Sequence, residues 1–132
     1  MNIFTDEQIE ELLHNGQPDW TRDDHVPVAK LYIPDTKCVW LFTELKPSDP
    51  TKGMALYVDD GMTAYRHVDI QELIDEIPKD FPGKNLCLDP DFVGEQPISG
   101  YRFAAETLGY IIDDPDDLSL YTRRLKTFQY KP

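Results

Sequence analysis

Long apolar runs are absent from this sequence of 132 residues. No stretch approaches the roughly 20 consecutive apolar residues that a helix needs to cross a lipid bilayer. Residues 1–7 contain neither a basic region nor an apolar core, so they do not resemble a secretory signal. We therefore expect a cytoplasmic protein that is not embedded in a membrane.

Cysteine and histidine are scarce, with two Cys and three His in the chain. Cys38 and Cys87 both lie in apolar, strand-like surroundings, which favours two buried free thiols in a reducing compartment, with a single disulfide as the alternative. The run Asp23-Asp24-His25 contains metal-ligating side chains. However, adjacent residues rarely converge on one ion, and no second cluster supplies further ligands. We predict no metal site and no cofactor.

Recognisable catalytic motifs are also absent. No serine or cysteine stands in a nucleophile elbow, and the isolated glycines form no phosphate-binding loop. Because the chain has 25 acidic residues, accidental carboxylate pairs are common and no one pair is evidence of acid–base catalysis. We predict no catalytic residue. A small hydrolase that uses Asp59, Asp60 and His67, which cluster near one hairpin, stays open as an alternative.

Positive charge is in short supply. There are 13 Lys and Arg against 25 Asp and Glu, which gives a net charge of −12. Residues 1–100 hold 20 acids and 8 bases, whereas residues 101–132 hold 5 of each. A field of this sign repels nucleic acid and anionic membranes, and it attracts basic surfaces within a Debye length of roughly 10 Å. We expect a basic protein surface as partner, without direct nucleic-acid or membrane binding. The alternative is that the charge serves only solubility.

The pattern of apolar residues predicts an α+β fold, in which an antiparallel sheet of about four or five strands packs against three or four helices in a single domain. Segments rich in β-branched and aromatic residues predict a meander of strands. The strands of the meander lie at 28–33, 38–45, 54–58 and 63–68, and a further short strand is predicted at 86–88. Residues 46–53 are expected to form a loop, and Asp59-Asp60-Gly61 a tight turn.

Capping signals predict where the helices begin and end. Thr5 and Gln8 form a capping box before a helix that Gly16 ends, and Asp69 caps a second helix that Pro78 ends. A third helix is predicted over residues 101–108, and a fourth begins at Asp114-Pro115. We expect residues 1–101 to form the main domain and residues 102–132 a helical extension packed on it.

The outward faces of the first two predicted helices are acidic. Carboxylates spaced along a helix can imitate the phosphates of a nucleic-acid duplex, so that a DNA-binding protein would bind them through the same Lys and Arg side chains. The ordinary alternative is a solvated helix surface. The predicted partner-binding residues are Glu7, Glu10, Glu11, Asp23, Asp24, Glu72, Asp75 and Glu76.

Several segments resemble the DUF2958 family, which consists of small proteins of unassigned function. They are Phe4-Thr5-Asp6-Glu7-Gln8, the strand pair from Pro27 to Leu45, the run from Pro47 to Pro50, His67 to Leu73, and Ile98-Ser99-x-Tyr101. The resemblance covers about residues 4–101 and implies no activity. It does imply a setting, which is the bacterial cytoplasm and an association with plasmids and other mobile elements.

These observations lead to two further hypotheses about function. The first is a non-enzymatic module of a phage or plasmid that acts as a DNA mimic. It would occupy the basic nucleic-acid-binding surface of a host nuclease complex, as an anti-CRISPR or anti-restriction inhibitor does. The alternative is an accessory of plasmid replication or conjugation that binds a protein through its C-terminal helix, with Leu118, Tyr121, Arg124 and Phe128 at the interface.

Overall fold

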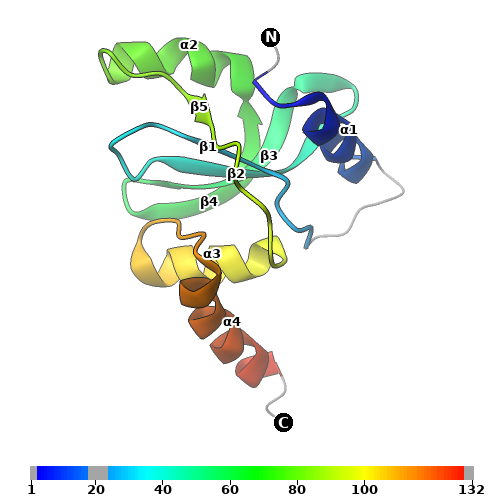
Figure 1. Ribbon diagram of the computed structural model, residues 1–132, viewed down its shortest axis with the longest axis vertical. Helices are drawn as coiled ribbons and strands as arrows, with labels where there is room; N and C mark the ends of the chain where they lie inside the picture. The colour runs from blue at the N-terminus through cyan, green and yellow to red at the C-terminus, as the bar shows by residue number, and fades with distance from the viewer. Residues whose placement is uncertain (1–2, 18–23, 130–132) are drawn as a thin grey trace.

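The computed structural model describes residues 3–17 and 24–129, with side chains placed as far as residue 123. Five strands form one antiparallel sheet in the spatial order β4-β3-β2-β1-β5 (Figure 1). They are β1 (Ala29–Tyr32), β2 (Val39–Lys46), β3 (Asp49–Asp59), β4 (Met62–Asp69) and β5 (Cys87–Leu88). The first four strands form the predicted meander, and β5 returns along the other side of β1.

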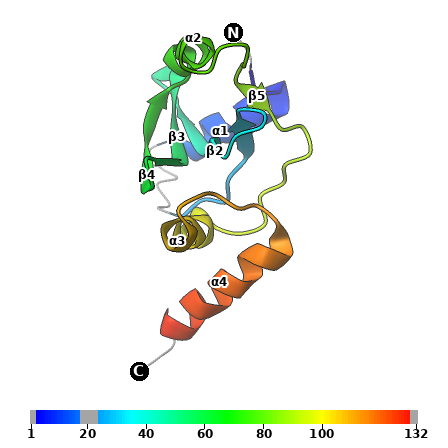
Figure 2. The same ribbon diagram turned by 90° about the vertical axis from the view of Figure 1, so that its left-hand side faces the viewer.

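Helices cover both faces of the sheet. On one face lie α1 (Asp6–Asn15) and α2 (Ile70–Asp80), and on the other lie α3 (Ile98–Leu108) and α4 (Pro115–Gln129) (Figure 1). Viewed from the side, α4 packs its first turns under the domain and then extends away from the sheet (Figure 2). The predicted single α+β domain is confirmed.

Two apolar cores result from this three-layer arrangement. Leu12 of α1, Phe42 of β2 and Ile70 of α2 belong to the first core, whereas Leu41 of β2 and Tyr101 of α3 belong to the second. Successive side chains of a strand point to opposite faces. The adjacent Leu41 and Phe42, both fully buried, therefore show that β2 is covered on both sides.

The first two helices begin as predicted. The Thr5 backbone N–H donates to Oε1 of Gln8 at 3.0 Å, and the Gln8 backbone N–H donates to Oγ1 of Thr5 at 3.1 Å, which completes the capping box of α1. Asp69 Oδ1 accepts from the backbone N–H of Glu72 at 3.0 Å and caps α2. Two of the free backbone donors of α1, and one of α2, are thereby satisfied.

The predicted loop at residues 46–53 is wrong, because β3 begins at Asp49 rather than at Met54. Lys46 pairs directly with Asp49, so that only Pro47 and Ser48 form the turn. Of the two register shifts between these strands, one leaves Thr43 as an extra residue in β2, and the other leaves residues 50–52 as extra residues in β3. Pairing between β3 and β4 starts only at Lys52. The strand can therefore contain Pro50, which has no N–H to donate, since no β4 residue pairs with it.

Two helix boundaries also differ from the prediction. Pro78 does not end α2, which continues to Asp80 and closes with the Phe81 N–H donating to the Ile77 carbonyl at 2.8 Å. The proline removes one donor near the end of the helix without breaking its last turn. The third helix, α3, begins at Ile98 rather than at residue 101.

The two cysteines are free thiols, as predicted, but both are half-buried rather than fully buried. Cys38 follows the turn between β1 and β2, and Cys87 lies in β5 opposite Tyr32. Cys87 Sγ lies 3.4 Å from the Asn85 carbonyl oxygen and donates to it.

Gly16 is required by a close approach between α1 and β2. A Cβ atom on Gly16 would collide with the Leu45 carbonyl oxygen, a backbone atom that cannot swing away. We expect Gly16→Ala to lower the free energy of unfolding by about 2–3 kcal/mol, measured by chemical denaturation.

Gly83→Ala provides the comparison, because Gly83 has φ +81 and no heavy atom within 4 Å of its added Cβ. It should lose only the roughly 1 kcal/mol that a left-handed conformation costs an L-residue. Equal losses for the two variants would contradict the steric explanation for Gly16.

Candidate functional site

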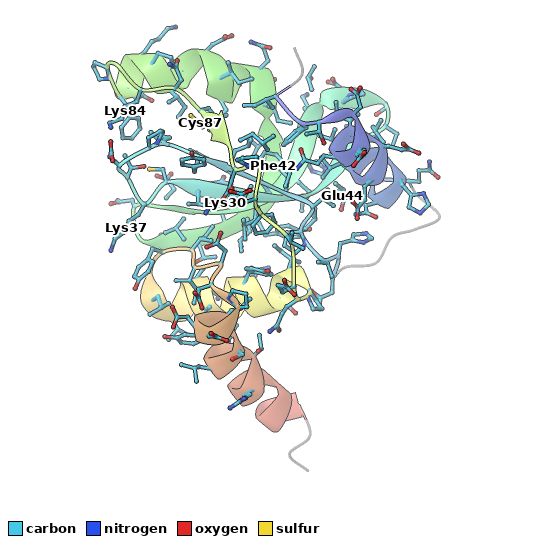
Figure 3. The ribbon with its side chains drawn as sticks, viewed as in Figure 1. Lys30, Lys37, Phe42, Glu44, Lys84 and Cys87 are labelled. Atoms are coloured by element: carbon cyan, nitrogen blue, oxygen red, sulfur yellow. The ribbon has the colours of Figure 1, made fainter. Side chains whose placement is uncertain are left out.

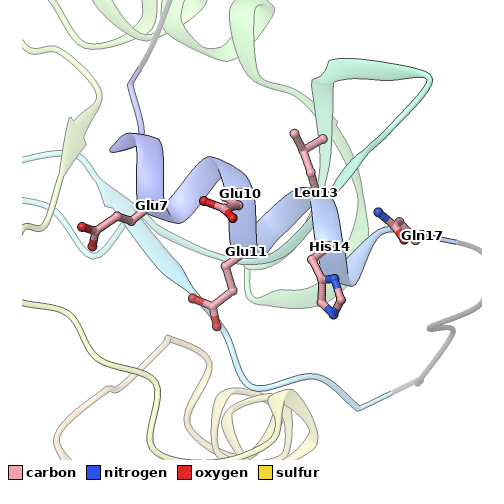
Figure 4. A pocket seen from close by; sticks show the side chains of 6 residues that line it. All are labelled: Glu7, Glu10, Glu11, Leu13, His14 and Gln17. Carbon is pink, nitrogen blue, oxygen red and sulfur yellow. The ribbon is translucent and has the colours of Figure 1, made fainter.

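Three carboxylates of α1 face solvent. Glu7, Glu10 and Glu11 are exposed and line, with His14, a shallow depression of about 550 Å³. Figure 4 shows Glu11 and His14 projecting on one side of α1 while Leu13 points to the other. Within the residues that the structure describes, these three glutamates form no ion pair with Lys or Arg. Their charge therefore remains available to a partner.

The carboxylates of α2 are exposed as well. Asp75 accepts a hydrogen bond from Gln71 at 3.0 Å, and Glu76 lies 3.5 Å from Nζ of Lys79. Both contacts are at the surface, where such pairs contribute little stability. The structure thus places Glu72, Asp75 and Glu76 on the outer side of α2, as the sequence predicts.

The acidic surfaces of α1 and α2 belong to the same side of the sheet, because Leu12 and Ile70 bury the inner sides of these helices in one core. Negative charge is not confined to this side. Exposed carboxylates next to or on α3 and α4 include those of Asp91, Glu95, Glu106, Asp114, Asp116 and Asp117. Net charge alone therefore does not define a binding face.

Asp24 has a structural role that its sequence position does not reveal. Its two carboxylate oxygens accept from the backbone N–H of Ser99 at 2.8 Å and from the Ser99 hydroxyl at 2.7 Å. Ser99 lies in the first turn of α3, whose N-cap residue Pro97 provides no side-chain hydrogen bond. Asp24 thus caps α3 from a distance, which explains why α3 starts at Ile98. Asp23 lies outside the described residues.

A groove between α2 and the sheet distinguishes this side of the molecule. Its volume is about 440 Å³. Large apolar side chains from three elements line it, of which Trp40 of β2, Tyr57 of β3, and Leu73 of α2 are half-exposed. Neither Tyr57 nor Leu73 belongs to the two apolar cores or to the side chains packed against them. These two side chains are therefore available for contact from outside.

Acidic residues surround this groove. Asp59, Glu72, Glu76 and Asp80 are all exposed and line it, and no Lys or Arg is found among the described lining residues. Glu72 and Glu76 are thus shared between the predicted partner-binding set and the groove. Tyr57 was not among the predicted site residues, although it lies two residues after the buried Ala55 and so faces the same way.

The residues suggested for a hydrolase do not converge. Asp59 pairs with Met62 at the start of β4, and His67 lies five residues after Met62 in the same strand. At 3.3 Å per residue, Met62 and His67 are about 16 Å apart along the strand. Asp60 occupies the turn with φ +50. In the described part of the chain, no group of three His, Cys, Asp or Glu side chains could hold a metal ion.

On the opposite side, Lys30 joins three parts of the chain. Its Nζ lies 2.8 Å from Asp113 Oδ2 and 3.5 Å from Asp89 Oδ2, and 5.8 Å from the centre of the Tyr32 ring. Burial lowers the pKa of Lys30, but the hydrogen bond and charge of Asp113 and the charge of Asp89 outweigh it, so the pKa is raised. Figure 3 shows Lys30 in the middle of the sheet. This cluster fastens the segments after β5 and α3 to β1.

The C-terminal helix contributes to the second core. Leu118 is fully buried and packs with Tyr101 and Ala104 of α3, and Tyr121 is partly buried beside them. The expectation that Leu118 is an interface residue is therefore wrong. The side chains of Arg124 and Phe128 lie outside the described part of the structure.

The fold and this surface define a small α+β protein with an acidic, grooved helical side. The family model described as "Protein of unknown function (DUF2958)" matches residues 3–112, and the chain belongs to this family. The match extends beyond the resemblance noted at residues 4–101 and ends between α3 and α4. The resemblance had ended at residue 101, which lies inside α3, whereas the family match includes the whole of this helix. Neither a curated protein nor a solved structure matches the chain. In the described residues, no helix is long and apolar enough to cross a membrane.

Lys30→Met tests the cluster around Lys30. The side chains of Asp89 and Asp113 are 25% and 35% exposed. We therefore expect a loss of about 1–2 kcal/mol at pH 7, less than for a fully buried pair. Because the pKa of Lys30 is raised in the folded protein, its contribution is fully present below pH 10.5 and is lost as the pH rises through the folded-state value.

Chemical denaturation at pH 7 and above pH 10.5 measures this difference, which should narrow at the higher pH. Lys79→Met is the matched control, because Lys79 is exposed and its one ion pair among the described residues is with Glu76 of its own helix. A loss for Lys30→Met no larger than for Lys79→Met would contradict the proposed fastening role.

Asp24→Ala tests the distant cap of α3. We expect a loss of about 1–2 kcal/mol in the free energy of unfolding, as for other helix caps. Asp24→Asn keeps one acceptor oxygen and should lose less. Thermal or chemical denaturation should show that stability falls from the wild type to Asp24→Asn and further to Asp24→Ala. Equal stability of the three proteins would refute the capping role.

Proposed function

We propose that this protein is a non-enzymatic binding module whose α1/α2 side docks on a basic protein surface. One observation carries the proposal. The helices α1 and α2 both carry exposed carboxylates and pack on the same face of the sheet, and α2 also forms one wall of a groove lined by half-exposed apolar side chains. Protein interfaces commonly combine a desolvated apolar centre with a polar rim.

The two components have different physical roles. Exposed ion pairs contribute about 0.2–1 kcal/mol each, so carboxylates alone give a weak complex that salt dissociates. They steer a basic partner toward the α1/α2 side and orient it. Apolar contacts in the groove then supply the burial that the ion pairs lack.

The concrete form that we propose is an inhibitor of a nuclease effector in host defence, such as a CRISPR or restriction complex. Effectors of this kind bind DNA through Lys and Arg side chains that contact phosphates. A protein with net charge −12 is able to compete for these side chains. The burial of Leu118 supports the α1/α2 side, rather than the beginning of α4, as the docking surface.

Neutralising the carboxylates tests the proposal. Two triple variants are compared with the wild type. The α1 variant combines Glu7→Gln, Glu10→Gln and Glu11→Gln, and the α2 variant combines Glu72→Gln, Asp75→Asn and Glu76→Gln. Each should weaken inhibition or binding of a purified effector by about tenfold, which is 1.4 kcal/mol. The measurement is DNA cleavage by a panel of CRISPR effectors and restriction endonucleases, together with titration calorimetry at low and high salt.

The matched control removes the same charge from the other side, with Glu95→Gln, Glu106→Gln and Asp117→Asn, all of which are exposed. It should leave inhibition nearly unchanged. If the control weakens binding as much as the α1 and α2 variants do, net charge and not a face is responsible. Failure to inhibit any member of the panel would exclude the nuclease-inhibitor form.

A further inference from the structure

We propose that the groove between α2 and the sheet receives the apolar side chains of a cationic amphipathic segment of a partner protein. This inference rests on the proposed function and names the chemistry that the α2 side recognises. The occupant would present leucine-like or aromatic side chains inward and Lys or Arg side chains outward.

The apolar side chains that line the groove are only partly covered by the rest of the protein. Of its lining residues, only Ile77 is buried, while Trp40, Tyr57, Leu73 and Phe81 all remain half-exposed. Large apolar residues scattered singly on a surface are normal, but a contiguous group with a polar rim marks an interaction site. The geometry therefore favours an occupant that covers these side chains.

The charge of the rim selects the sign of the occupant. Asp59 lies at the hairpin end of β3, and Glu72, Glu76 and Asp80 follow one another along α2. An anionic ligand or acidic peptide would be repelled, whereas Lys and Arg can lay their alkyl stems on apolar surface and keep their charged ends at the carboxylates.

The dimensions of the groove fit a peptide segment. It reaches from Asp59 to His67 and Val68, and the stretch of β4 between Met62, which pairs with Asp59, and His67 is about 16 Å long at 3.3 Å per residue. Three turns of an α-helix cover the same length at 5.4 Å per turn. Helices recognised in grooves of this kind insert side chains at i, i+3 or i+4, and i+7.

Three synthetic amphipathic peptides of equal length provide the probe. The first combines Lys with Leu on one helical face, the second replaces Leu with Ser, and the third replaces Lys with Glu. Fluorescence of Trp40 reports entry into the groove, in a Trp20→Phe background so that Trp40 is the remaining tryptophan. We expect the Lys–Leu peptide to shift Trp40 emission and to bind about tenfold more tightly than the Lys–Ser peptide, and the Glu–Leu peptide not to bind.

The double variant Tyr57→Ala, Leu73→Ala should bind the Lys–Leu peptide about tenfold or more weakly than the wild type does. The variant should remain folded, since neither side chain packs against a core. The matched control is Val93→Ala with Leu120→Ala, which removes exposed apolar side chains outside the groove. Circular dichroism and thermal unfolding verify the folding of both variants.

The outcomes separate this inference from the proposed function. Equal affinity for the Lys–Leu and Lys–Ser peptides, or no effect of the Tyr57 and Leu73 changes, overturns the groove as the site even if effector inhibition still depends on the α1 and α2 carboxylates. Binding of the Glu–Leu peptide overturns the cationic occupant. Sedimentation that shows a dimer weakened by the Tyr57 and Leu73 changes would assign the groove to a second copy of this chain and overturn the proposal.

Discussion

The burial of β2 on both faces is the constraint on which the rest of the structure depends. Phe42 faces the core under α1 and α2, and Leu41 faces the core under α3 and α4. One strand thus holds both helical layers, and neither layer can shift without disturbing the other. This rigidity matters for the acidic side, because carboxylates on helices that are already held in place lose less conformational entropy when a partner binds.

The sequence predicted the elements whose signals are local. The Thr5–Gln8 capping box, the Asp69 cap and the β-turn at Asp60-Gly61 all depend on residues within a few positions of one another. The start of β3 was missed because Pro50 looks like a strand breaker, and only the extent of β4 shows that its missing N–H is not needed.

The site was only partly predictable for the same reason. Helical periodicity correctly placed Glu72 and Glu76 on the outer side of α2, because exposure on a helix follows a local pattern. The groove, in contrast, forms where β3 and β4 meet a helix, and nothing near Tyr57 in sequence indicates that α2 leaves it uncovered. Asp24 caps α3 through Ser99, which lies 75 positions further along the chain, and Lys30 contacts Asp113, which lies 83 positions further along. No local sequence signal indicates contacts over such separations.

The family match ends at residue 112, just before α4, yet Leu118 of α4 is fully buried against Tyr101 and Ala104. In this chain α4 is consequently part of the second core and cannot be removed without exposing it. A chain truncated at residue 112 would expose the apolar side chains of α3 that Leu118 covers. Such a chain would either associate through this exposed surface or unfold.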